Sequence, residues 1–442
     1  MYSVNMNSSQ KKVAFMTLGC KVNTYDSEAM MEIFERADYE IVDFTEIADV
    51  YVINTCTVTH LGDQKSRKMM RRAKRLNPNA VICAVGCYVQ VSPEEVEKIE
   101  EVDLMIGTKN RIDILSFIDA HLKDQNQRDF VSNIMREKVF EPLTISEVKG
   151  KTRAVIKIQE GCNQFCTYCI VPFARGPVRS RIKEDVVAEV KRVVEMGYRE
   201  VVLSGIHIAS YGVDQGNTDL IDLMEELDKI DGLKRIRLGS MEPKFVIESR
   251  LKRLAELDSF CPHFHLSLQS GSDTVLKRMS RHYTTSEYLD IANQIREVFP
   301  LAALTTDIMV GFPGETPAEF EETLDFARAV GFYQIHVFKY SRRLGTKAEK
   351  FDNQVDETVK TARSHILSEL TNELEEAFLI KNDGQIAAVL FESTHNGNRY
   401  EGHTKNYIPV VLDTDEKING KIIELRVLYK DTHSNKLTGN FI

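Results

Sequence analysis

The feature that most constrains the fold is a pattern that repeats six times between Arg153 and about Lys339. Each repeat consists of a strand-like apolar run, a polar or glycine-bearing loop and an amphipathic helix-like segment. The strand-like runs lie at residues 153–158, 199–203, 234–238, 263–268, 303–309 and 333–338. Six such units predict a curved parallel sheet, an incomplete (β/α)6 barrel, in which the loops after the strands carry the chemistry.

The first of these loops contains three cysteines, Cys162, Cys166 and Cys169, in the spacing C-x3-C-x2-C. Three thiolates on one short loop indicate a metal site, because soft sulfur ligands select zinc, copper(I) or iron–sulfur clusters. A structural zinc needs a fourth ligand, and no Cys or His follows within the next 35 residues. A [4Fe–4S] cluster held by three cysteines leaves one iron open to a substrate. Buried structural cysteines, and a zinc site completed from elsewhere in the chain, are the alternatives.

A second set of cysteines lies in residues 12–120, where strand-like and helix-like segments alternate and predict a parallel α/β sheet. Cys20, Cys56 and Cys87 each fall a few residues past the end of a predicted strand. Since such sheets bind ligands at the carboxyl edge of their strands, these cysteines can hold a second cluster there. Taken singly, each would more often be structural. We expect that structural role for Cys83, inside an apolar run, and for Cys261, outside every motif.

The length of 442 residues predicts two to four domains. Residues 123–152 are polar and predict a linker, and residues 356–380 predict a connecting helix. The last segment has short alternating runs separated by Asn-Gly and Asp-rich turns, which predict a small antiparallel β domain. The expected domains are therefore an N-terminal α/β domain at 1–122, a partial barrel at 153–355 and a β domain at 381–442.

Composition restricts the compartment and the partners. The first ten residues lack an apolar core, and no apolar run approaches 18 residues, so we expect a cytoplasmic protein. Eight cysteines then favour metal or redox use over a disulfide framework. The net charge of −9 argues only weakly against nucleic acid, because residues 61–75 carry seven basic side chains against one Asp. That segment is either a solvated helix face or an RNA phosphate contact.

The cysteine spacing, with the aromatic Tyr168 before the last Cys, is similar to the signature of the radical S-adenosylmethionine (SAM) enzymes. In that family SAM chelates the open iron, and one electron cleaves it to methionine and a 5′-deoxyadenosyl radical. The order of domains resembles the methylthiotransferases over nearly the whole chain, with a C-terminal TRAM-type RNA-binding domain. The segments Leu18–Asn23, Asn54–Val58 and Gly86–Tyr88 match that family's auxiliary-cluster positions. The resemblance implies two [4Fe–4S] clusters, on Cys20, Cys56 and Cys87 and on Cys162, Cys166 and Cys169.

Other residues of the barrel loops are candidates for cofactor or substrate contacts. The cofactor candidates are Tyr168, Ser204, Gly205, Glu242, Gln269, Val310 and Gly311. An ordinary tight turn at Ser204–Gly205 and a helix N-terminal role for Glu242 are the alternatives. Arg175, Arg179 and Arg181 follow the cluster loop and could clamp a cofactor carboxylate, steer an RNA phosphate or form internal salt bridges. His207 is expected to be a loop residue without a partner.

The resemblance implies that SAM is used twice, once to methylate a sulfur at the auxiliary cluster and once to supply the radical that attacks an aromatic C–H. The residues in these motifs look most like those of the methylthiotransferase branch that acts on N6-threonylcarbamoyladenosine at tRNA position 37. The isopentenyladenosine branch is second and the ribosomal-protein aspartate branch third. Implied partners are the tRNA anticodon region, an electron donor and a sulfur source, without a membrane. A hypothesis of another class is a non-catalytic, metal-stabilised RNA-binding protein.

Overall fold

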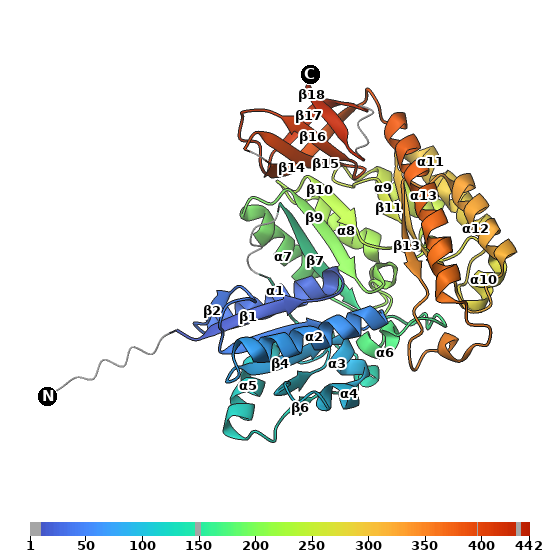
Figure 1. Ribbon diagram of the computed structural model, residues 1–442. Coiled ribbons are helices and arrows are strands. Elements are labelled where there is room, and N and C mark those ends of the chain that lie inside the picture. Colours follow the sequence, from blue (N-terminus) through green and yellow to red (C-terminus); the bar gives the residue numbers. More distant parts are fainter. Residues whose placement is uncertain (1–9, 146–151, 396, 430–434) are drawn as a thin grey trace. The chain divides into compact units, whose positions relative to one another are not determined.

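The computed structural model describes residues 10–145, 152–395, 397–429 and 435–442 (Figure 1). These residues form two compact units. The first contains residues 10–145 together with 160–164 and 169–179. The second contains residues 152–159 and 165–168 and the described residues from 180 onward. No helix in the described ranges is both long and apolar enough to cross a membrane.

The first unit is built on a six-stranded sheet in the order β2-β1-β3-β4-β5-β6, and each strand pair is parallel. Its strands are β1 (Lys12–Thr17), β2 (Glu40–Val42), β3 (Val50–Thr55), β4 (Val81–Gly86), β5 (Leu104–Ile106) and β6 (Asp129–Phe130). The chain moves outward in opposite directions from β1 and β3. Ligands bind at such a switch point in open α/β sheets.

Successive apolar side chains along each strand point to opposite faces of this sheet, so both faces are apolar. In β3, Val50 and Val52 join one core cluster, whereas Tyr51 and Ile53 join another. The helices of this unit are α1 (Lys21–Arg36), α2 (His60–Leu76), α3 (Cys87–Val91), α4 (Pro93–Glu97), α5 (Ile114–Lys123) and α6 (Val171–Arg175), with short 3-10 turns η1 (Arg111–Asp113) and η2 (Ile134–Arg136). The predicted parallel α/β fold is confirmed.

The second unit contains the predicted incomplete barrel. Two sheets, in the orders β10-β9-β7-β8 and β11-β12-β13, are joined by the parallel bridges Ile236–Phe260 and Met241–Leu266. The strands are β7 (Arg153–Glu160), β8 (Arg179–Ser180), β9 (Glu200–Gly205), β10 (Arg235–Leu238), β11 (His263–His265), β12 (Ala303–Val310) and β13 (Gln334–Lys339). The helices are α7 (Lys183–Glu195), α8 (Leu220–Asp228), α9 (Glu248–Ala255), α10 (Asp273–Arg278), α11 (Thr285–Val298) and α12 (Pro317–Val330), with η3 (Ile208–Ser210), η4 (Pro243–Phe245) and η5 (Ala348–Lys350).

The long helix α13 (Glu357–Lys381) packs against β13 and leads to the C-terminal β domain (Figure 1). That domain is a closed barrel in the order β14-β15-β16-β18-β17. Its strands are β14 (Ile386–His395), β15 (Arg399–Thr404), β16 (Pro409–Asp413), β17 (Ile422–Leu428) and β18 (Leu437–Phe441). The pairs are antiparallel except for β16 with β18, which are parallel. The alternating runs at 386–392, 408–412 and 422–429 predict β14, β16 and β17, whereas β15 and β18 were not predicted.

The proposed linker at 123–152 needs correction in its described part. β6 pairs with β5 as the edge strand of the first sheet. The Tyr25 hydroxyl donates a hydrogen bond of 3.0 Å to the Leu143 carbonyl, and Glu141 accepts one of 2.9 Å from Arg111 Nε. These contacts build much of the segment into the first unit, which its polar composition concealed. Residues 146–151 lie outside the described residues.

Candidate active site

Cys20, Cys56 and Cys87 lie at the carboxyl ends of three adjacent strands. Cys20 follows β1, Cys56 directly follows β3, and Cys87 directly follows β4. The register pairs Thr17 with Asn54 and Thr55 with Gly86, so the three strands end at similar levels. The parallel pairing therefore brings the three cysteines to one edge of the sheet.

The loops that carry these cysteines are held together by Asn23. Its side-chain amide donates hydrogen bonds of 2.7 Å to the Leu18 carbonyl and 2.9 Å to the Thr55 carbonyl. Gly19 has a φ of +106°, and a Cβ at this position would lie 3.0 Å from Cys56 Cβ and 3.2 Å from Cys56 Sγ. A side chain at this position would be strained at this φ and would press against Cys56. The loop after β1 is therefore packed against the Cys56 sulfur.

The charges around Cys87 show that the three sulfurs share one environment. Burial raises the pKa of the Cys87 thiol to about 11, and Arg175 counteracts this rise. Thiolates at Cys20 and Cys56 raise the pKa of Cys87 further, because like charges at short range oppose ionisation. Arg175 Nε lies 3.2 Å from Cys87 Sγ and can donate a hydrogen bond to it.

Arg175 belongs to a buried network of three arginines and three carboxylates. Its guanidinium donates to Asp26 at 2.9 Å and also contacts Asn23 and Glu160. Arg111 binds Asp26 and Glu141, and Arg179 lies 3.7 Å from Glu160. The network members, all nearly inaccessible to solvent, are Asp26, Arg111, Glu141, Glu160, Arg175 and Arg179. Opposite charges compensate one another here, as buried ions require.

The three-cysteine loop begins after β7, at Gly161. Gly161 has a φ of +77°, and a Cβ there would lie 1.8 Å from the Pro177 carbonyl oxygen, so only glycine fits. The Cys162 amide donates a 3.0 Å hydrogen bond to the Gly176 carbonyl. Cys162 and Cys169 belong to the first unit, and Cys166 belongs to the second. The structure thus divides a loop that the sequence analysis had assigned wholly to the barrel.

In the second unit, Cys166 is buried beside a cation. Arg281 Nη1 lies 3.5 Å from Cys166 Sγ, and Arg281 Nη2 donates a 2.8 Å hydrogen bond to Glu242 Oε2. Glu242 also lies 3.8 Å from His207 Nε2. Burial raises the pKa of Glu242, but His207 and Arg281 lower it more, so the net pKa is below its usual value. The group His207, Glu242 and Arg281 is therefore a linked polar cluster beside one cysteine of the loop.

The remaining cofactor candidates occupy the carboxyl ends of barrel strands or the loops beside them. Tyr168 packs against the cluster of Val275, Met279, Phe312, Tyr340 and Ala348. Ser204 is buried at the end of β9, and a Cβ on Gly205 would lie 2.9 Å from the Gln159 carbonyl oxygen. Gln269 has a φ of +72°, and its backbone bridges Asp307 and Met309 of β12.

Val310 and Gly311 lie where β12 ends. Val310 is fully buried. The Gly311 amide donates a 2.6 Å hydrogen bond to Glu315, which also pairs with Arg363 at 2.5 Å. This amide therefore already has an internal acceptor.

The arginines after the cluster loop are occupied internally. Arg175 and Arg179 belong to the buried network described above, and Arg181 pairs with Glu189 at 2.5 Å. All three are at most 3% exposed. This burial favours internal salt bridges over a direct RNA phosphate contact.

Sequence analysis missed Arg281 and misjudged His207. His207 has partners, since its Nδ1 lies 2.5 Å from Ser210 Oγ and its Nε2 faces Glu242. Arg281 follows α10 in a segment without a motif, and no local signal connects it to a cysteine more than 100 positions away. Such pairings depend on the tertiary fold.

Two family models match the chain. The radical SAM superfamily matches residues 156–327, and the uncharacterized protein family UPF0004 matches residues 12–107. The first match includes the three-cysteine loop, and the second includes Cys20, Cys56 and Cys87. The partial barrel and its loop define a radical SAM enzyme, which implies SAM and a [4Fe–4S] cluster as cofactors.

Curated relatives place the chain more closely. The threonylcarbamoyladenosine tRNA methylthiotransferase MtaB of Bacillus subtilis (strain 168) is 44% identical over 421 residues, which cover 94% of this chain and 93% of the relative. The protein of the same name from Aquifex aeolicus (strain VF5) is 41% identical, covering 94% and 100%. A tRNA-2-methylthio-N(6)-dimethylallyladenosine synthase of Clostridium botulinum (strain Loch Maree / Type A3) is 36% identical, covering 96% of each. The chain belongs to the radical SAM tRNA methylthiotransferases.

Solved structures share the fold at low sequence identity. The radical SAM methyltransferase TsrM from Kitasatospora setae, with cobalamin and a [4Fe–4S] cluster bound, has a TM-score of 0.55 and 15% identity over 75% of each chain. The cobalamin-dependent SAM radical enzyme OxsB has a TM-score of 0.51 and 13% identity, covering 84% of this chain and 56% of that chain. These similarities concern the fold alone.

Proposed function

We propose that this enzyme adds a methylthio group to C2 of N6-threonylcarbamoyladenosine at position 37 of tRNA, in the cytoplasm. The observation that best supports this reaction is that Cys20, Cys56 and Cys87 lie at one sheet edge, in a chain that also has a radical SAM loop. The choice of nucleoside rests on two relatives named for it, at 44% and 41% identity.

The residues around Cys166 suit a SAM-bound [4Fe–4S] cluster. Cys162, Cys166 and Cys169 form no disulfide and would supply three ligands, leaving one iron for SAM. When bound, the cluster would supply the one-electron chemistry on SAM that is needed to replace a C–H hydrogen that no general base could take. The Arg281 guanidinium offsets negative charge at the Cys166 thiolate and is itself oriented by Glu242. Ser204, Gly205, Gln269, Val310 and Gly311 are proposed to border SAM.

The residues at the first sheet edge suit an auxiliary [4Fe–4S] cluster, which would carry the sulfur that is transferred. Cys20, Cys56 and Cys87 form no disulfide and offer three soft sulfur ligands, one fewer than a closed structural zinc site needs. Three cysteines suit instead a [4Fe–4S] cluster with one open iron. Arg175 then supplies a hydrogen bond and a positive charge to the cluster ligand Cys87.

The α2 helix and the C-terminal barrel are the proposed tRNA contacts. Lys68, Arg71 and Arg75 are exposed along one side of α2 and line an open hollow of about 440 Å³ with Gln64 and Arg67. Basic side chains in such an arrangement neutralise phosphates without reading sequence. The closed β-barrel is proposed as a TRAM-type RNA-binding domain. An electron donor and a sulfur source complete the set of partners.

The test is an anaerobic assay with reconstituted protein, SAM, sulfide and reductant, followed by nucleoside mass spectrometry of the tRNA. Threonylcarbamoyl- and isopentenyl-modified tRNAs are offered side by side. We expect the methylthio mass gain on the threonylcarbamoyl nucleoside alone. Gain only on the isopentenyl nucleoside would keep the reaction and overturn the substrate.

Three other candidates have distinct outcomes in this assay. The isopentenyl substrate is favoured by the 36%-identical relatives, which are named for dimethylallyladenosine. No gain on either tRNA, from protein with both clusters verified, would direct attention to the ribosomal-protein aspartate. A colourless protein that holds zinc and does not consume SAM would instead be a non-catalytic RNA-binding protein.

A further inference from the structure

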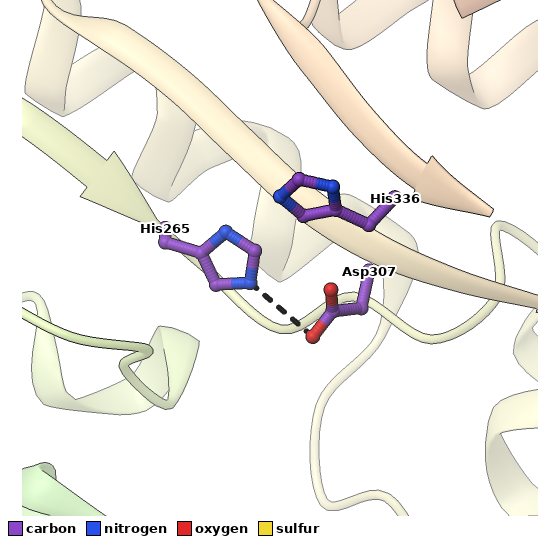
Figure 2. A group of neighbouring side chains, drawn as sticks. All are labelled: His265, Asp307 and His336. Atoms are coloured by element: carbon purple, nitrogen blue, oxygen red, sulfur yellow. Dashed lines mark ion pairs between the residues drawn. The ribbon is translucent and has the colours of Figure 1, made fainter. Parts of the chain in front are cut away.

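Three potential metal ligands outside the cysteine sites meet on the second sheet of the partial barrel. His265, Asp307 and His336 come from the neighbouring strands β11, β12 and β13 (Figure 2). Asp307 and His336 are direct register partners. One ligand atom from each residue lies within 4.8 Å of the other two, and His265 Nε2 is 3.2 Å from Asp307 Oδ2.

These side chains face away from the helices that cover the sheet. Thr306 Oγ1 and the hydroxyl of Tyr288, on α11, both donate to the Leu266 carbonyl, so Thr306 faces the helical layer. Side chains alternate along a strand, and Asp307 therefore faces the barrel interior. The side chains of His265 and Asp307 are 12% and 26% exposed, and His336 is exposed. An ion can reach the group from solvent.

Hydrogen bonds behind the group orient His265. Its Nδ1 lies 3.0 Å from Thr305 Oγ1, and that hydroxyl lies 2.9 Å from His263 Nε2. The bond at Nδ1 leaves Nε2 directed at Asp307. Metal-binding histidines commonly use one ring nitrogen for the ion while the other forms such a supporting bond. Two histidines and one carboxylate also form a recurrent ligand set for divalent iron.

We propose that His265, Asp307 and His336 bind a divalent transition-metal ion, separate from the cysteine-ligated clusters. Ligands at about 2.1 Å lie roughly 3.5 Å apart around a tetrahedral ion, so modest side-chain rotation closes the site. The single carboxylate offsets half of the ion's charge. With three protein ligands the ion keeps at least one position open toward the barrel interior, where an oxygen or nitrogen donor can bind.

The test uses cobalt(II), because cobalt can be counted separately from cluster iron. Full-length protein with both clusters reconstituted is freed of loose metal and dialysed against cobalt(II), and bound cobalt is measured by elemental mass spectrometry. We expect one tight cobalt per chain, with affinity falling about tenfold or more in His336→Ala and in Asp307→Asn. The matched control His365→Ala, an exposed histidine of α13 that pairs with Glu369, should bind as the parent does.

Two further measurements distinguish the possible outcomes. Iron content and circular dichroism of each variant verify that the clusters and the fold are intact. X-ray absorption at the cobalt edge should show nitrogen and oxygen ligands only. Equal cobalt affinity in the parent and His336→Ala, no tight cobalt at all, or sulfur in the cobalt shell would each overturn the proposal and leave His265 and Asp307 as a simple ion pair.

Discussion

Gly19 and Cys56 make a close contact in the first site at the scale of single residues. The φ of +106° at Gly19 disfavours a side chain, and a Cβ there would lie 3.0 Å from Cys56 Cβ, so Cys56 would have to shift. The position of the Cys56 sulfur therefore depends on a residue that ligates nothing.

We predict that Gly19→Ala reduces the iron bound by the chain, because the added methyl group displaces Cys56. The matched control is Gly197→Ala, where φ is +99° but nothing lies within 4 Å of the added Cβ. Both variants carry backbone strain of roughly 1–2 kcal/mol, so only the contact differs. Iron and sulfide analysis after reconstitution measures the result. Full iron content in Gly19→Ala would show that the contact is unimportant.

The cysteines were predictable from sequence because their meaning is local: a fixed spacing in one loop, and positions just after strands in the other set. The side chains that surround the cysteines could not be predicted in this way. Arg281 beside Cys166, and the pairing of Arg111 with Asp26 across 85 residues, depend on which elements the fold brings together. Burial of Arg175 and Arg179 was equally hidden, since an arginine in a loop is usually exposed.

At the scale of elements, the docking of the C-terminal barrel depends on a buried charge cluster. Glu200 accepts a 2.9 Å hydrogen bond from Arg237 and lies 3.4 Å from Arg235. The same arginines donate to carbonyls of the C-terminal barrel, Arg235 to Ala388 and Arg237 to Lys405. The carboxylate thus keeps both guanidinium groups positioned for the barrel.

We predict that Glu200→Gln lowers the free energy of unfolding by about 3–5 kcal/mol, because two buried cations lose their partner. The control Glu226→Gln removes an exposed carboxylate that pairs with Lys229, and should leave the free energy of unfolding nearly unchanged. Urea titration followed by circular dichroism measures both. Equal stability of the two variants would show that the charge cluster of Glu200, Arg235 and Arg237 does not stabilise the docking of the C-terminal barrel.

Helix α13 contains a carboxyl group that makes stability depend on pH. Burial raises the pKa of Glu375 from 4.5 to about 7. Between pH 4.5 and about 7, the Glu375 carboxyl loses its proton in the unfolded chain but keeps it in the folded chain. The stability that Glu375 contributes is therefore fully present below pH 4.5 and is lost as the pH rises toward 7. We predict that Glu375→Gln flattens this decline in melting temperatures recorded from pH 5 to 8. A parallel decline in both proteins would contradict the assignment.

The six strands of the barrel repeats were predicted to within a few residues because each has an apolar pattern. Three of the strands that were not predicted lack that pattern. β6 has only two residues, and β15 (RYEGHT) and β18 (LTGNF) are polar and contain glycine. Their strand conformation comes from pairing inside a closed barrel, which no local pattern shows.

At the scale of the whole molecule, the two units contain different parts of the machinery that the proposed reaction requires. The first supplies three cysteines at a sheet edge and the basic face of α2, and the second supplies the partial barrel and the C-terminal barrel. The cluster loop divides its residues between them. Sequence patterns predicted the order of these parts, but not the inclusion of residues 169–179 in the first unit.

We predict that Lys68→Ala with Arg75→Ala weakens tRNA binding and lowers the slope of log affinity against log salt by up to about 1.8. Each neutralised phosphate releases counterions, and both side chains are exposed on α2. The control pair Lys191→Ala with Arg192→Ala removes two exposed cations of α7. Binding isotherms at several salt concentrations measure the slopes. Identical losses from both pairs would mean that charge alone, and not the α2 face, determines binding.

Our proposal requires that Cys20, Cys56 and Cys87 form a sulfur-donating cluster site separate from the SAM site. The most direct test compares Cys87→Ala with Cys83→Ala, which removes a buried cysteine of the same chain segment. Both reconstituted variants are assayed for 5′-deoxyadenosine and for the methylthio nucleoside. We predict that Cys83→Ala forms both products, whereas Cys87→Ala still cleaves SAM and forms no methylthio nucleoside. Methylthio product from Cys87→Ala would show that Cys87 is not needed for a sulfur-donating cluster.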